Sequence, residues 1–159
     1  MSDGLSQVSV MSIYQDCLGR MWFGTREGVS IYDGERMRVY KGWENLDPES
    51  SINVLLGHEC DHLTGNRQGD IFFRTCDSLV RYDIREEKFC VVSGCKAKTI
   101  TSADGDIWTG YDDMVCRYDE KGDSLQLYAK TNTPGISSLL ISGKKIWIGT
   151  YAVSYTHLR

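Results

Sequence analysis

The residues of this chain that could do chemistry most directly are two histidines spaced four apart. The segment His58-Glu59-Cys60-Asp61-His62 matches the zinc-binding pattern His-Glu-x-x-His. On a helix the two imidazoles would share one face and could bind one Zn²⁺, with Glu59 activating a water molecule. On a strand four residues span about 13 Å, so the two rings could not reach one ion. The chemistry therefore depends on the element that carries the segment.

That element is identified by a repeat that runs through the chain. Gly19, Gly69 and Gly105 each begin the same pattern, with an aliphatic residue at +2, a large aromatic at +3, an apolar residue at +10 and Tyr-Asp at +13 and +14. The aromatic residues at +3 are Trp22, Phe72 and Trp108, and the tyrosines are Tyr32, Tyr82 and Tyr118. A fourth copy begins at Lys144 and includes Trp147 and Gly149. Self-similarity at a fixed spacing predicts an array of like units.

Each unit has the pattern of short strands separated by tight turns. In the first unit we expect strands over 8–14, 20–25, 28–32 and 37–40, and Asp33-Gly34 is a strong hairpin signal because glycine tolerates positive φ. Four antiparallel strands followed by a longer link are typical of a propeller blade. The sequence therefore predicts an all-β fold, a β-propeller fragment of about three and a half four-stranded antiparallel blades. The expected limits are 4–42, 52–93 and 97–130 for three blades, 136–150 for a partial fourth, and 151–159 for a foreign or disordered tail.

The same register bears on the histidine pair. It places His62 seven residues before Gly69, on the first strand of the second unit, and Gln68 stands where the extended zinc pattern requires histidine. A zinc metallopeptidase that uses His58 and His62 is therefore the less favoured alternative. We expect no catalytic residue, no metal and no cofactor in this segment.

The aromatic residue at +3 has a structural explanation. Blades stack face to face, so a flat ring in mid-blade would fill the wedge between neighbours. Gly24 and Gly110, two residues further on, would leave room for side chains of the next blade. The alternative is that Trp22, Phe72 and Trp108 form a surface on which sugars stack.

Composition excludes several function classes. The net charge is −4 with acids and bases interleaved, so no basic stripe suggests a nucleic-acid partner. No apolar run is long enough to predict a membrane span, and the first residues carry no secretion signal. The six cysteines form no Cys-x-x-Cys pair, although Cys90 and Cys95 could close a short disulfide loop in an oxidising compartment.

The motifs of the first unit resemble a known family. Gly19-Arg20-Met21-Trp22-Phe23-Gly24-Thr25 and Tyr32-Asp33-Gly34 are similar to the two-component regulator propeller repeat, and Lys145-Ile146-Trp147-Ile148-Gly149-Thr150 matches it again. The match is weaker in the second unit, where Phe72-Phe73-Arg74-Thr75 replaces Trp-x-Gly-Thr. The resemblance covers about residues 4–150.

The resemblance implies the extracytoplasmic sensor of a bacterial hybrid two-component system, periplasmic in the parent protein. Such sensors have two seven-bladed propellers, a small β-sandwich and a membrane span, with kinase, receiver and DNA-binding modules on the cytoplasmic side. The expected ligand is an oligosaccharide released from glycans, and the expected partners are the remaining blades and a second copy of the parent, as a homodimer. The alternative is a propeller that only provides a scaffold for protein–protein or dimer contacts.

Four residues are predicted to bind the ligand. Arg26, Arg74 and Tyr111 fall at the loops between the second and third strands of their units, where they would emerge on one face of a propeller. Arginine offers fork-like donors and an aromatic ring offers a platform, which together suit a sugar. Trp43, in the long first link, is either such a platform or a cap over the next blade.

Overall fold

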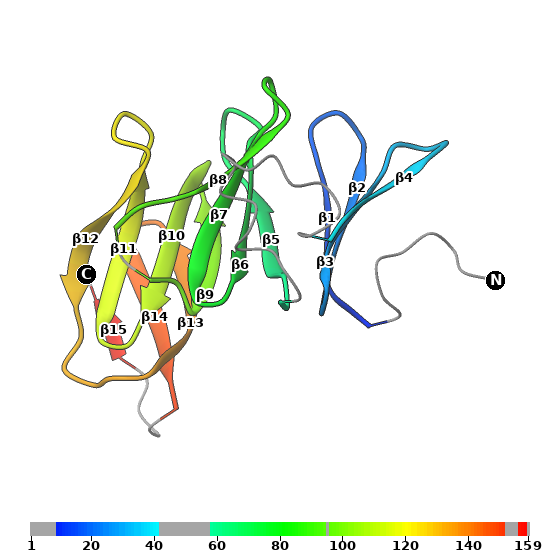
Figure 1. The fold of residues 1–159 in the computed structure, drawn as a ribbon. Coiled ribbons are helices and arrows are strands. Elements are labelled where there is room, and N and C mark those ends of the chain that lie inside the picture. The colour runs from blue at the N-terminus through cyan, green and yellow to red at the C-terminus, as the bar shows by residue number, and fades with distance from the viewer. Residues whose placement is uncertain (1–8, 42–57, 95, 152–155, 159) are drawn as a thin grey trace.

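The structure, a computed structural model, describes residues 9–41, 58–94, 96–151 and 156–158 and arranges them in an arc of four antiparallel sheets (Figure 1). The described residues contain no helix, and nothing among them is a helical segment able to cross a membrane. Three sheets have four strands and the fourth has three, each in chain order. The first sheet is β1 Val10–Gln15, β2 Met21–Thr25, β3 Gly28–Tyr32 and β4 Met37–Tyr40; the second is β5 Asp61–Gly65, β6 Ile71–Thr75, β7 Ser78–Asp83 and β8 Lys88–Val91; the third is β9 Thr99–Ala103, β10 Asp106–Tyr111, β11 Met114–Asp119 and β12 Ser124–Lys130; the fourth is β13 Ile136–Ser142, β14 Lys145–Thr150 and β15 Thr156–Leu158. The predicted all-β propeller fragment with four-stranded antiparallel blades is confirmed.

The aspartate of each Tyr-Asp pair forms the turn that ends the third strand. Asp33 Oδ1 accepts hydrogen bonds from the backbone amides of Glu35 and Arg36, at 2.9 and 2.8 Å. Asp83 Oδ1 accepts from the second and third amides after it in the same way, at 2.9 and 3.0 Å. A side-chain carboxylate that satisfies the amides of a turn favours the hairpin, which explains why the repeat carries aspartate there.

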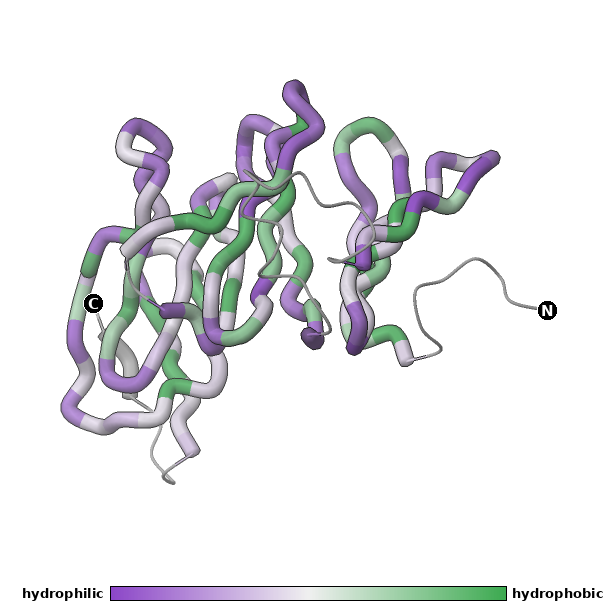
Figure 2. The backbone as a smooth tube through the Cα atoms, viewed as in Figure 1, coloured by the Kyte–Doolittle hydropathy of each residue, from purple (hydrophilic) through white to green (hydrophobic). Residues whose placement is uncertain are grey.

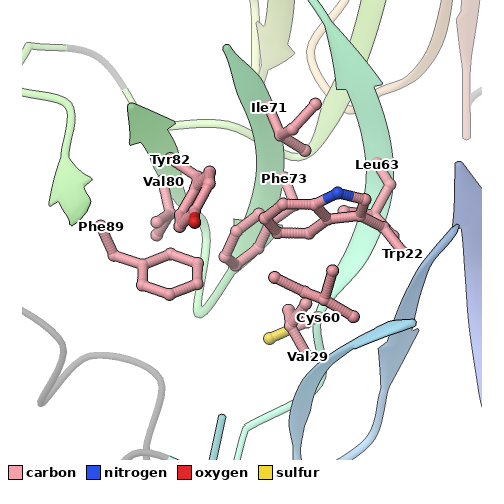
Figure 3. Close-up of a cluster of buried hydrophobic side chains, with 10 residues drawn as sticks. Trp22, Val29, Cys60, Leu63, Ile71, Phe73, Val80, Tyr82 and Phe89 are labelled. Carbon is pink, nitrogen blue, oxygen red and sulfur yellow. The ribbon is translucent and has the colours of Figure 1, made fainter. Parts of the chain in front are cut away.

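The core consists of apolar clusters between successive sheets. The first cluster joins the first and second sheets around Trp22, which is fully buried (Figure 3). The ring of Tyr82 lies edge-on to Trp22, with centroids 4.8 Å apart, and Tyr118 meets Phe72 in the same way at 4.9 Å. The tyrosines of the second and third units therefore cover the aromatic residue of the unit before, and such edge-to-face pairs add roughly 0.5–1.5 kcal/mol beyond area burial. The prediction that the rings at +3 fill the wedges between blades is confirmed for Trp22, Phe72 and Trp108.

Two glycines allow the sheets to approach. A Cβ on Gly24 would overlap the carbonyl oxygen of Cys60, immediately before β5, and would lie 3.5 Å from Leu63 Cδ1 within β5. A Cβ on Gly110 would lie 2.6 Å from Ile136 Cγ2 of the fourth sheet. These contacts confirm that both glycines leave room for the neighbouring sheet.

Hydrogen bonds also tie each sheet to the next. The backbone amide of Cys60 donates to the carbonyl of Thr25 at 2.8 Å, and the amide of Ile136 donates to the carbonyl of Asp112 at 2.9 Å. The first strands of successive sheets are neighbours as well, because the amide of Leu63 in β5 donates to Ser12 Oγ in β1 at 3.0 Å. Figure 2 shows apolar stretches along the strands and largely hydrophilic hairpin turns at the upper end of the arc.

The last sheet continues past the limit expected from the sequence. Residues 156–158 pair with β14 as β15, with Trp147 opposite His157. The expected blade limits and the foreign origin of the tail stay predictions. The Cys90–Cys95 disulfide that the sequence allows lies partly outside the described residues, and Cys90 is a free thiol.

Candidate functional site

The turns that connect the strands lie at two opposite edges of the arc, one at each end of the strands. The turns β1–β2 and β3–β4, with their equivalents in later sheets, lie at one end, which we call the hairpin end. The two-residue turns β2–β3, β6–β7 and β10–β11 lie at the other end, which we call the link end because the last strand of one sheet ends there and the first strand of the next sheet begins there. The predicted ligand-binding residues are all from the link end, apart from Trp43, which lies outside the described residues.

At the link end, Arg26 and Tyr111 are the more accessible candidates. Arg26 is exposed in the turn between β2 and β3. Tyr111 is the half-buried last residue of β10, and Lys96 Nζ lies 5.6 Å from the centroid of its ring. The structure does not bring these two side chains into one described pocket, and their role in ligand binding stays a prediction.

Arg74 has a different environment from the one expected. It lies inside β6 rather than in the loop, and its side chain is only 16% exposed. Its Nε donates to Asp61 Oδ1 at 2.7 Å, a second nitrogen binds Asp61 Oδ2, and a third lies 3.5 Å from Asp77 Oδ1. The fork of donors that suggested a ligand site is therefore already occupied by carboxylates of the protein.

The histidine pair also lies at this end, and it lacks the helical geometry that a zinc peptidase needs. His58 precedes β5, while His62 lies in β5 at a register irregularity with a φ of 55°. His62 Nδ1 donates to Asp61 Oδ1 at 2.9 Å. Among the described residues no group of three or more histidine, cysteine or acidic side chains could hold a metal ion.

Asp61 joins these side chains electrostatically. Its burial would raise its pKa, but the hydrogen bonds from Arg74 and then from His62 outweigh that effect and lower the pKa to about 2. Asp61 therefore stays ionised and holds Arg74 and His62 in place, which is a structural role.

A cleft opens at the hairpin end, between the second and third sheets. Its volume is about 440 Å³, and the turn β5–β6 provides one wall while β11, β12 and the turn between them provide the other. The polar and aromatic side chains that line it include Arg67, Gln68, Asp106, Arg117, Glu120 and Tyr128. None of these residues was predicted from the sequence.

The third-sheet wall of the cleft combines an aromatic ring with charged groups. Tyr128 is 57% exposed, and its ring lies edge-on to Trp108 with centroids 4.7 Å apart. Arg117 lies 5.6 Å from the Trp108 centroid and donates to Asp106 Oδ2 at 2.7 Å. An exposed ring beside a guanidinium and a carboxylate can stack on an apolar sugar face and hydrogen-bond to sugar hydroxyls.

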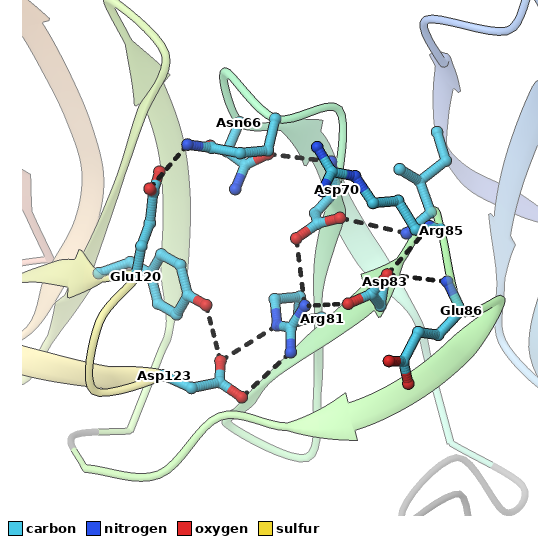
Figure 4. Close-up of polar contacts among 11 residues, drawn as sticks. Asn66, Asp70, Arg81, Asp83, Arg85, Glu86, Glu120 and Asp123 are labelled. Carbon is cyan, nitrogen blue, oxygen red and sulfur yellow. Dashed lines mark hydrogen bonds and ion pairs between the residues drawn. The ribbon is translucent and has the colours of Figure 1, made fainter.

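A partly buried polar cluster links the two walls (Figure 4). Arg81 of β7 binds both oxygens of Asp123 in the third sheet at 3.1 Å, and it also contacts Asp70 and Asp83 at 3.1 Å. Tyr118 donates to Asp123 at 2.6 Å, and burial together with the neighbouring carboxylate raises the pKa of Tyr118. Two parallel bonds from one guanidinium to one carboxylate give a rigid link. The cleft therefore has a preformed shape.

The sequence offered only a partial signal for this cleft. Tyr128 lies next to a register shift between β11 and β12 that allows its ring to turn toward Trp108. Such a bulge cannot be located from residue types alone. Arg67 of the second sheet reaches the third-sheet wall of the cleft because its backbone amide donates to the carbonyl of Gly105 at 3.0 Å. The two residues are 38 positions apart in the chain.

Comparison with known proteins agrees with the fold. No protein-family model matches the chain. The extracellular domain of the putative hybrid two-component system BT3049 from B. thetaiotaomicron is similar over 98% of this chain, with a TM-score of 0.80 and 22% identity. The corresponding domain of BT4673 from the same organism is similar over 94%, with a TM-score of 0.62 and 17% identity. Histidine kinase P4 of Formosa agariphila is 42% identical over 52 residues, which is 33% of this chain.

The chain spans only part of each of these proteins, namely 24% and 23% of the two solved domains and 4% of the kinase. At these identities the solved structures show the fold alone. The expected resemblance to extracytoplasmic domains of hybrid two-component systems is confirmed at that level.

Proposed function

We propose that this chain is a segment of the ligand-sensing ectodomain of a hybrid two-component sensor, and that the ligand is an oligosaccharide. The observation that carries the proposal is the match to the BT3049 extracellular domain over 98% of the chain. Catalysis has no part in the proposal, since the expected kinase lies elsewhere in the parent protein. The location that goes with this function is extracytoplasmic, and more narrowly periplasmic, with the parent acting as a homodimer.

The cleft at the hairpin end is the ligand site in this proposal. Tyr128 provides a platform for a sugar ring, and Arg117 with Asp106 provides donors and acceptors for its hydroxyl groups. The cleft contains both charge signs, from Arg67 and Arg117 and from Asp106 and Glu120, which suits a neutral sugar better than a strongly charged one. Preformed walls reduce the entropy lost on binding.

The link end is the competing position for the same function. Arg26 and Tyr111 are accessible there, whereas the guanidinium of Arg74 is bound by Asp61 and Asp77. Fold similarity cannot distinguish the two ends, because loops on either face of one scaffold can carry a site.

A glycan-array screen of the intact ectodomain tests the ligand class, and variants test the position. We expect oligosaccharides to bind, and Tyr128→Ala to lower the affinity about tenfold or more, which corresponds to about 1.4 kcal/mol. Arg26→Ala is the matched control at the opposite end and should bind like the wild type. Loss of binding in Arg26→Ala but not in Tyr128→Ala would move the site to the link end, and no binding to any glycan would contradict the oligosaccharide proposal.

The scaffold alternative has one observation in its favour, which is that large apolar side chains are exposed on the outer faces of the first and fourth sheets. These include Ile13, Tyr32, Leu140 and Trp147. In an intact sensor, the remaining blades of the propeller would cover such faces, so the exposed side chains are compatible with both functions.

A further inference from the structure

A smaller hollow adjoins the cleft at the hairpin end, and it also lies between the second and third sheets. Its volume is about 210 Å³, compared with about 440 Å³ for the cleft. Gln68, Tyr118 and Glu120 line both spaces, so the cleft and the smaller hollow share a wall. The other side chains of the smaller hollow are polar, namely Asn66, Asp70, Arg81 and Asp123.

The shared wall has a fixed part and a part that can move. Tyr118 is fixed, because its hydroxyl donates to Asp123 at 2.6 Å and its ring lies edge-on to Phe72 at 4.9 Å. Gln68 and Glu120 are exposed, and Gln68 Nε2 donates to Glu120 Oε2 at 2.7 Å. This hydrogen bond joins the turn β5–β6 to the turn β11–β12. Its net contribution is small because water can replace either partner, and a sugar hydroxyl can replace them in the same way.

The smaller hollow offers hydrogen-bond acceptors to a ligand. Asp70 accepts from the amide of Ile84 and from Arg81, both at 3.1 Å, which uses about half of the lone pairs of its carboxylate. Three carboxylates and one guanidinium line the hollow, so its formal charge is −2. In Figure 4, Glu120 and Asp123 of the third sheet face Asn66 and Asp70 of the second. Such a surface suits the hydroxyl groups of an uncharged sugar and repels an anionic sugar.

We propose that the ligand extends from the cleft into the smaller hollow, so that the site takes at least two sugar units. The first unit stacks on Tyr128, and a second, uncharged unit occupies the hollow. The hydrogen bond between Gln68 and Glu120 opens as the second unit enters, and Gln68 Nε2 then donates to one of its hydroxyl groups. Gln68 therefore determines which chain length binds best. This inference rests on the proposed function, because it assigns a second subsite beside the same cleft.

Isothermal titration calorimetry of the intact ectodomain tests the second subsite, with the monosaccharide and the disaccharide contained in a glycan from the array screen. We expect the wild type to bind the disaccharide about tenfold or more tightly than the monosaccharide. Gln68→Ala should reduce this gain about fivefold, the size of one net hydrogen bond, and should change monosaccharide affinity by less than about twofold. A disaccharide whose second unit is a uronic acid should show no gain.

Lys121→Ala is the matched control. Lys121 is exposed like Gln68, but it lines only the cleft and not the smaller hollow, so its removal should leave the gain from the second unit unchanged. Both variants change exposed side chains and should fold, as near-ultraviolet circular dichroism can verify.

The outcomes separate this inference from the proposed function. Equal binding of the two sugars by the wild type, an equal loss for both sugars in Gln68→Ala, no loss in that variant, a reduced gain in Lys121→Ala, or a full gain from the uronic acid would each overturn the second subsite while leaving sugar binding intact. Binding of no glycan would overturn the proposed function and this inference with it.

Discussion

The indole Nε1 of Trp22 donates a hydrogen bond of 2.8 Å to Asp16 Oδ2, six residues earlier, inside the first sheet. The Asp16 side chain is fully buried, and its other oxygen accepts from the backbone amides of Leu18 and Arg20. In the second sheet the corresponding residues are Asn66 and Phe72, and Asn66 Oδ1 accepts only the equivalent amide, from Asp70, at 2.9 Å. In the second sheet, where phenylalanine replaces the indole, asparagine also replaces the carboxylate.

This relationship predicts the cost of removing the indole. Trp22→Phe should lower the free energy of unfolding by roughly 1–3 kcal/mol, because it leaves a buried carboxylate oxygen with one partner fewer. Asp16→Asn combined with Trp22→Phe reproduces the pair found in the second sheet, so the double variant should lose less than the sum of the two single variants. Urea denaturation of the four proteins gives the coupling energy, and strict additivity would contradict the account.

A second prediction concerns the closest approach between the first two sheets. Gly24→Ala should destabilise the protein by roughly 1–3 kcal/mol, because a methyl group there overlaps the Cys60 carbonyl and forces the sheets apart. Gly122→Ala is the control, since its nearest neighbours are the side-chain oxygens of Asp119 and Ser124 at 3.0 Å, in an exposed turn. Equal thermal unfolding curves for the two variants would show that the Gly24 contact does not limit packing.

A third prediction concerns the polar cluster beside the cleft. Arg81→Leu should lower the free energy of unfolding by roughly 1–3 kcal/mol, because it leaves Asp70, Asp83 and Asp123 without their shared cation, while the exposure of Asp123 lets solvent screen part of the loss. Arg81→Lys should recover only part of this loss, since an ammonium cannot bind both oxygens of Asp123 in the same way. As a control, Lys88→Ala breaks an exposed pair with Glu86 at 3.8 Å and should change stability by at most about 1 kcal/mol. Similar denaturation midpoints for Arg81→Leu and Lys88→Ala would be inconsistent with a structural role for Arg81.

Acid stability provides a fourth prediction. The pKa of Asp61 falls from an ordinary value of 3.8 to about 2 in the folded protein. A lowered folded-state pKa means that the ionised group stabilises the fold above pH 3.8 and that this contribution is lost as the pH falls toward about 2. Melting temperatures measured through this range should drop less steeply for Asp61→Asn than for the wild type. An identical pH dependence in the two proteins would exclude Asp61 as a source of acid sensitivity.

The sequence predicts the local structure of the sheets well because local signals are strong there. The strands at 28–32 and 37–40 are found as expected, since Asp33 and Gly34 determine the hairpin between them. The burial of Trp22 and the space at Gly24 also follow from the repeat, because a stacked array applies the same packing constraint in every unit.

The site residues are less predictable because long-range contacts decide their roles. Arg74 suggests a ligand donor from its position in the repeat, yet Asp61 of the adjacent strand binds its guanidinium. Arg81 and Asp123 are 42 positions apart and meet only when the second and third sheets stack. The cleft beside them depends on that stacking and on the turn of Tyr128 at an irregular strand pair, neither of which has a local sequence signal.

The proposal of a glycan sensor is tested most directly by a crystal structure of the intact ectodomain bound to an oligosaccharide found in the array screen. The account predicts a sugar ring stacked on Tyr128, with hydroxyl groups within hydrogen-bond distance of Arg117 or Asp106. A sugar bound at the link end beside Arg26 and Tyr111, or bound only to other parts of the ectodomain, would contradict it.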